Sequence, residues 1–206
     1  MNGALALARR LGAMLGGGTD GNEQLTAIAG TALLILLAVL GVTIIRIGQL
    51  LWLHLFLGLL LIGPVVLKLA STGYRFALYY AGAGAYRRKG PPHPLLRGLA
   101  PLLVVSTLVV FATGVILLVD GPGSRGRWLE IHKVSFIVWL VAMAPHVLGH
   151  LFELAPARSL KGGTGGGSGR AIALASAVVG GAVIAVVLLP DFAAWTSAHF
   201  HHHRHG

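Results

Sequence analysis

The feature that most constrains this chain is an apolar run over residues 128–154 that contains three histidines. His132, His146 and His150 lie in a segment long enough to cross a bilayer. At about 100° per residue, the 18-residue step from His132 to His150 returns to the same helix face, and His146 lies about 40° away. Ionisable groups inside a membrane helix are costly and usually serve a function. The run therefore predicts a membrane helix with imidazoles at two depths, as a haem protein, a proton path or an intramembrane metal site requires.

The composition supports a membrane protein. Hydrophobic residues make up 55% of the 206 residues and charged residues 11%, whereas a soluble domain carries about a quarter charged residues. The chain has no cysteine, which excludes disulfides, Cys-ligated iron–sulfur clusters and thiolate zinc sites. The net charge of +10 comes from basic residues in loops beside apolar runs, so we expect no nucleic-acid-binding face.

The pattern predicts an all-α integral membrane fold with five transmembrane helices, the first four forming a bundle of two similar hairpins. The expected spans are residues 25–45, 50–70, 99–119, 128–154 and 171–189. The connection at 71–96 is polar, and its early part could be an interfacial amphipathic helix. The corresponding divisions are an N-terminal segment at 1–24, the bundle at 25–155, a Gly/Ser linker at 156–170, the fifth helix at 171–190 and a His-rich tail at 191–206.

The distribution of lysine and arginine predicts the orientation. With the N-terminus inside, the inner segments hold eleven of the 16 basic residues and the outer segments five. We therefore expect a multi-pass protein of the cell membrane with a cytoplasmic N-terminus and an external C-terminus.

A faint internal repeat relates the two expected hairpins. Gly41-Val-Thr-Ile-Ile precedes a turn and His54, and Gly114-Val-Ile-Leu-Leu precedes a longer turn and His132. Each histidine lies four or five residues into a span that runs in the same direction, so the two imidazoles are expected at one depth. Two imidazoles on neighbouring helices can bind a haem iron from opposite faces.

Further residues are candidates for the surroundings of such a haem. Gly58, one turn from His54, and the hairpin glycines Gly41 and Gly114 would leave room for a flat macrocycle. Cationic partners for the haem propionates are expected at the outer end from Arg46, Arg125 and Arg127.

On these residues the chain resembles four-helix b-type membrane cytochromes, which include the cytochrome b subunits of formate dehydrogenases and nickel–iron hydrogenases. The resemblance covers roughly residues 30–155 and rests on His54, His132, His146 and Gly114. It implies haem b and electron transfer between quinone and a partner subunit or an external acceptor. Members commonly hold two haems, but Lys68 stands where a second-span partner for His146 would fall, so one haem is expected rather than two.

Other interpretations remain open. His54 and His132 could instead bridge helices by hydrogen bonds. His146 and His150 could have a structural role, contact a quinone together with Lys68, or bind a haem.

A non-redox protein, either a divalent metal-ion transporter or a structural membrane subunit, is the rival class. The tail could serve such a transporter, because clustered imidazoles bind Cu, Ni or Zn; its histidines are His199, His201, His202, His203 and His205. Carboxylates are lacking in the interior of the spans, with Glu153 at the edge of the fourth, and this argues against a transporter, since doubly charged cations usually need them. The sequence has no P-loop, GxSxG or HExxH motif, so we expect an electron-transfer protein or the membrane subunit of an oxidoreductase rather than a hydrolase.

Overall fold

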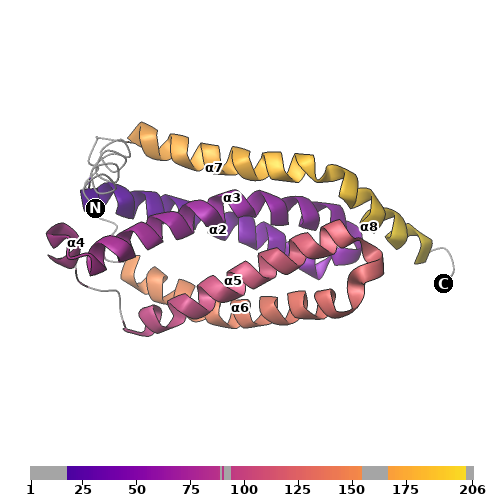
Figure 1. The fold of residues 1–206 in the computed structure, drawn as a ribbon, viewed down its shortest axis with the longest axis horizontal. Coiled ribbons are helices and arrows are strands. Elements are labelled where there is room, and N and C mark those ends of the chain that lie inside the picture. The colour runs from indigo at the N-terminus through magenta and orange to yellow at the C-terminus, as the bar shows by residue number, and fades with distance from the viewer. Residues whose placement is uncertain (1–17, 89, 91–93, 155–166, 203–206) are drawn as a thin grey trace. The chain divides into compact units, whose positions relative to one another are not determined.

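The computed structural model describes residues 18–88, 90, 94–154 and 167–202, and every regular element in these ranges is a helix (Figure 1). The elements are α2 (Gly18–Ile45), α3 (Ile47–Tyr80), α4 (Gly84–Arg88), α5 (Pro94–Asp120), η1 (Pro122–Ser124), α6 (Arg125–Leu154), α7 (Gly167–Val187) and α8 (Leu189–His202).

Five of these helices are long and apolar enough to cross a membrane. The candidate spans are Thr19–Ile45, Ile47–Tyr80, Leu96–Asp120, Arg125–Gly149 and Ser168–Val187. Helices suit a bilayer because each satisfies its backbone hydrogen bonds internally, where lipid offers no partners. The prediction of an all-helical, multi-pass membrane protein with five such helices is confirmed.

The bounds of α3 correct one prediction from the sequence. The helix does not end near residue 70 but continues to Tyr80, so the prediction that the connection begins at residue 71 is wrong. The segment after residue 70 is polar and aromatic but contains no proline, and polarity alone does not end a helix. The end comes only at Gly82, whose φ of 83° favours glycine.

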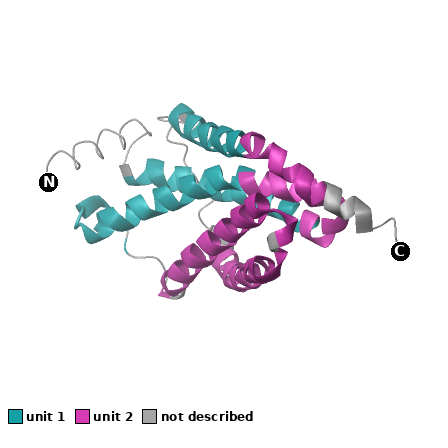
Figure 2. Ribbon diagram, turned by 45° about the vertical axis from the view of Figure 1, so that its right-hand side comes forward, with its two compact units in different colours: residues 1–42, 60–91, 162–184 teal, residues 43–59, 92–161, 185–206 magenta. Residues whose placement is uncertain are grey.

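The chain divides into two compact units, which are coloured separately in Figure 2. Unit 1 comprises Met1–Val42, Leu60–Pro91 and Gly162–Ile184, and unit 2 comprises Thr43–Leu59, Pro92–Lys161 and Ala185–Gly206.

In unit 1, α3 and α7 approach each other through two glycines. A Cβ atom on Gly63 would overlap the carbonyl oxygen of Ala177, and one on Gly181 would overlap that of Leu60. Small residues allow membrane helices this close backbone contact, which replaces the hydrophobic driving force that is missing in lipid. The Gly180-Gly181 pair in the fifth apolar run predicts a close helix approach, and the contact at Gly181 confirms it.

In unit 2, α5 and α6 form a hairpin, and α8 packs against the end of α5. The Nε1 group of Trp195 on α8 donates a hydrogen bond to the Leu117 carbonyl at the end of α5 (3.1 Å). Phe192 is only 2% exposed and meets the edge of the Trp52 ring on α3, with 6.1 Å between centroids. The segment beyond the fifth span therefore forms a helix that packs on α3 and α5 within unit 2.

Candidate functional site

Unit 2 brings together His54 on α3 and His132 on α6. Both side chains are partly buried, and the two imidazoles interact electrostatically. These are the two histidines that the sequence pattern placed at a common depth.

The hydrogen bonds of His132 define which ring nitrogen carries its proton. Its Nδ1 lies 3.1 Å from the Val110 carbonyl oxygen and 3.1 Å from Thr113 Oγ1, both on α5. A carbonyl can only accept a hydrogen bond, so Nδ1 must be the protonated nitrogen. The Thr113 hydroxyl donates to the Val109 carbonyl at 2.7 Å, which leaves its oxygen to accept from His132. In the neutral ring, Nε2 then keeps a lone pair that can bind a metal.

His54 makes a matching contact in the other hairpin. Its Nδ1 lies 3.0 Å from Oγ1 of Thr43 on α2. A hydroxyl can donate or accept, so this bond orients the ring without fixing its tautomer. Each histidine thus uses Nδ1 to contact a threonine on the preceding helix, and Nε2 is the nitrogen left for a ligand.

The glycines near the two histidines differ in their surroundings. A Cβ on Gly114 would lie 3.3 Å from Cε1 of His132, so the imidazole packs directly against the backbone of α5. A Cβ on Gly58 or on Gly41 would have no heavy atom of the described part of the chain within 4 Å. Gly114 therefore makes room for the imidazole, and open space adjoins α3 one turn from His54.

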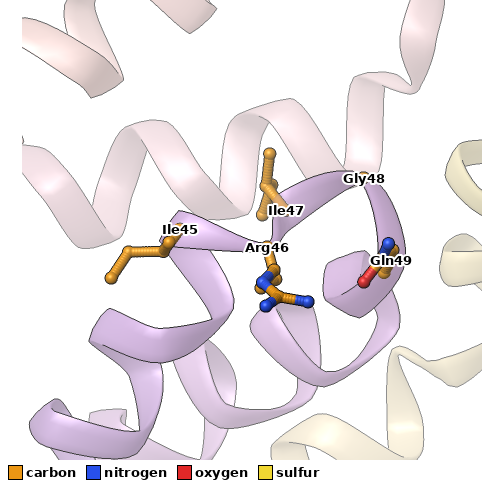
Figure 3. Close-up of a pocket in the computed structure, with 5 residues that line it drawn as sticks. All are labelled: Ile45, Arg46, Ile47, Gly48 and Gln49. Carbon is orange, nitrogen blue, oxygen red and sulfur yellow. The ribbon is translucent and has the colours of Figure 1, made fainter.

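The three arginines proposed as propionate partners are also in different settings. Arg46 and Arg127 are exposed, whereas the Arg125 guanidinium lies over the Trp195 ring, 5.6 Å from its centroid. A surface hollow at Arg46 is lined by Ile45, Arg46, Ile47, Gly48 and Gln49, consecutive residues whose side chains point in different directions (Figure 3). This hollow is a feature of the α2–α3 turn and does not resemble a binding site.

The predicted second cluster of His146, His150 and Lys68 remains a prediction. Lys68 belongs to unit 1, where its Nζ donates to the Thr26 carbonyl on α2 (2.7 Å) and lies against Gly30. His146 belongs to unit 2 and is partly buried on α6. The side chain of His150 lies outside the described residues. So do the side chains of the tail histidines His199, His201, His202, His203 and His205.

The count of possible ligands limits which metal group the described residues can hold. Among them, no three or more His, Cys, Asp or Glu side chains are grouped to bind a metal ion. Two imidazoles are too few for a zinc site, which needs three or four protein ligands. They are enough for haem, because the porphyrin supplies the four equatorial nitrogens and the protein supplies the axial ligands.

The sequence did not identify the two threonines that orient the histidines. Thr43 lies 11 residues before His54, and Thr113 lies 19 residues before His132. The two spacings differ because the connections differ in length, so no common motif links the partners. The only available signal was a hydroxyl within an apolar helix that adjoins a histidine-bearing one.

No family model, curated protein or solved structure matches this chain. The fold defines a multi-pass α-helical membrane protein, and its function has to be inferred from the geometry of His54 and His132.

Proposed function

We propose that this chain is a membrane b-type cytochrome that carries electrons through one haem held by His54 and His132. The observation that carries the proposal is the hydrogen bond from His132 Nδ1 to the Val110 carbonyl, which leaves Nε2 as a ligand nitrogen. His54 supports it, because its imidazole interacts electrostatically with His132 and its own Nδ1 contacts Thr43 Oγ1. Haem-ligating histidines typically use the second ring nitrogen in this way, which orients the ring and strengthens the ligand.

The surrounding residues fit a haem in three respects. Val110, Thr113 and Thr43 hold the two imidazoles, and the open space beside Gly58 provides room next to His54. Arg46 and Arg127 are exposed cations available to propionates. When bound, haem supplies a one-electron carrier whose potential depends on its axial ligands, their hydrogen bonds and the local dielectric.

We further propose that electrons pass between quinone and a partner subunit or external acceptor, in a cell membrane with the N-terminus on the cytoplasmic side. His146, His150 and Lys68 are the candidates for contact with the quinone head group, since an imidazole can move a proton as the quinone is reduced. The resemblance to cytochrome b subunits supports this part of the proposal.

The test is an absorption spectrum of the purified protein, expressed with sufficient haem, in the oxidised and dithionite-reduced states. We expect a Soret band, the split visible bands of a low-spin haem b, and one haem for each chain. A colourless protein would contradict the proposal. If it also bound zinc stoichiometrically, and lost that zinc on replacement of His146 and His150, the rival metal-ion transporter would be supported.

Replacement of His146 separates the one-haem proposal from a two-haem cytochrome. His146→Ala should leave the haem-to-protein ratio unchanged and slow the reduction of the haem by a quinol. Loss of half of the haem in this variant would show that His146 is itself a ligand and that the one-haem count is wrong.

A further inference from the structure

The corner between α3 and α4 in unit 1 has a defined backbone geometry. The Ala83 N–H bonds to the Leu78 carbonyl (3.0 Å) and the Gly82 N–H to the Tyr79 carbonyl (3.2 Å). With Gly82 at φ 83°, these two bonds form a Schellman motif, which ends α3 and reverses the chain. The corner is therefore held by specific bonds.

The reversal folds α4 back onto the end of α3. The rings of Tyr74 on α3 and Tyr86 on α4 meet edge to face, with 6.3 Å between centroids. Arg75 follows Tyr74 in the chain, and Arg87 and Arg88 follow Tyr86. The ring contact thus brings the two segments that carry these three arginines together at one corner.

These three charges have no anionic partner in the described residues. No ion pair joins Arg75, Arg87 or Arg88 to a carboxylate in that part of the chain, and residues 24–119 contain no acid at all. The described acids of unit 1, Asp20 and Glu23, lie on the first turns of α2 and have interactions of their own. Like charges on segments that a folded corner brings together repel one another, and a bound anion would offset this repulsion.

The position of the corner along α3 indicates the source of such an anion. At about 1.5 Å per residue, a helix of this length is roughly 50 Å long, whereas the hydrocarbon core is about 30 Å thick. The last turns of α3 also carry a cluster of aromatic rings in contact, Phe76, Tyr79 and Tyr80, of the kind that is enriched at the membrane–water interface. The corner should therefore lie at the depth of lipid phosphates.

We propose that the α3–α4 corner binds the phosphate head group of an anionic phospholipid through Arg75, Arg87 and Arg88. Guanidinium groups bind phosphate through paired N–H donors, and the negative surface potential of a membrane adds to this attraction. This site is independent of the haem proposed for unit 2.

Native mass spectrometry of the full chain, purified with mixed phosphatidylglycerol and phosphatidylcholine, tests the proposal. We expect selective retention of phosphatidylglycerol, weakened roughly fivefold for each arginine replaced by glutamine at Arg75, Arg87 or Arg88, as ~1 kcal/mol per basic residue predicts. Lys133→Gln, at an exposed basic residue of unit 2, is the charge-matched control and should retain the lipid.

A second variant tests the role of the corner geometry without changing charge. Gly82→Ala strains a residue at positive φ and should also weaken retention, while the α-helical circular dichroism of the protein stays the same. Equal retention of both lipids by the unaltered protein, or full retention by the triple arginine variant, would overturn the proposal. Displacement of the lipid by inorganic phosphate as readily as by excess phosphatidylglycerol would overturn the assignment to a lipid.

Discussion

The two histidines of unit 2 are held to different degrees, although each lies on the second helix of a hairpin. His132 has two hydrogen-bond partners on α5 and packs against Gly114, whereas His54 has one partner, Thr43. The position and tautomer of His132 are therefore defined by the protein alone. His54 has more freedom. We therefore expect the His54 ring to move when a ligand binds, while the His132 ring keeps its position.

The connection that precedes His132 is also better supported by contacts than the connection that precedes His54. A single residue, Arg46, joins α2 to α3, and the backbone departs from helical geometry at Leu50, four residues before His54. The α5–α6 connection includes Gly121 and η1, and Trp195 of α8 binds the carbonyl of Leu117 beside it. An additional helix thus supports the corner that leads to His132.

The largest expected effect is the loss of haem when either histidine is removed. His54→Ala and His132→Ala should each abolish the low-spin spectrum, because one imidazole alone leaves the iron five-coordinate or unbound. The double variant should be no worse than either single one, since both residues serve one ligand. If His132→Ala keeps its low-spin signal while His54→Ala loses it, the pairing of these two histidines is wrong.

The next largest effect should follow from crowding the His132 ring. Gly114→Val places methyl groups where Cε1 of His132 already lies 3.3 Å from the Cβ position, so the ring must move from α5 and weaken its bond to Val110. We expect a large fall in the haem-to-protein ratio. Gly41→Val, at the corresponding repeat position, has open space around its Cβ and should keep its haem. An equal fall in the haem-to-protein ratio of both variants would show that the substitutions disturb helix packing and not His132.

The smallest effect should be a shift in reduction potential when a threonine hydroxyl is removed. A hydrogen bond from Nδ1 makes the imidazole a stronger donor and favours oxidised iron, so its loss should raise the midpoint potential. Thr43→Val removes the one partner of His54, while Thr113→Val leaves His132 bonded to Val110. Redox titration should give a shift of a few tens of mV for Thr43→Val, as about 1 kcal/mol predicts for a one-electron couple. The shift for Thr113→Val should be smaller, and the reverse order would contradict the comparison.

The sequence predicted what depends on composition and helical periodicity. The five apolar runs predicted the five spans, and Gly181 predicted a close helix contact. Both features can be recognised within a single segment of the sequence. The continuation of α3 to Tyr80 was missed, since the end of a helix depends on capping geometry at Gly82 more than on polarity. The packing of α8 through Trp195 was also missed, because it joins residues 78 positions apart.

In the candidate site, too, some residues could be predicted from the sequence and others could not. His54 and His132 stood out in the sequence, as imidazoles in apolar runs at similar distances from a turn. Thr43, Thr113 and the Val110 carbonyl did not, because a hydroxyl or a carbonyl becomes a partner only when two helices pack in one register.

Electron paramagnetic resonance of the oxidised protein tests the central claim most directly, because it reports both axial ligands of a ferric haem. The account predicts a low-spin signal of bis-imidazole type that His54→Ala converts to high spin and that added imidazole restores. His132→Ala should respond in the same way. A high-spin signal in the unaltered protein, or a low-spin signal that persists in both variants, would show that His54 and His132 do not hold the iron.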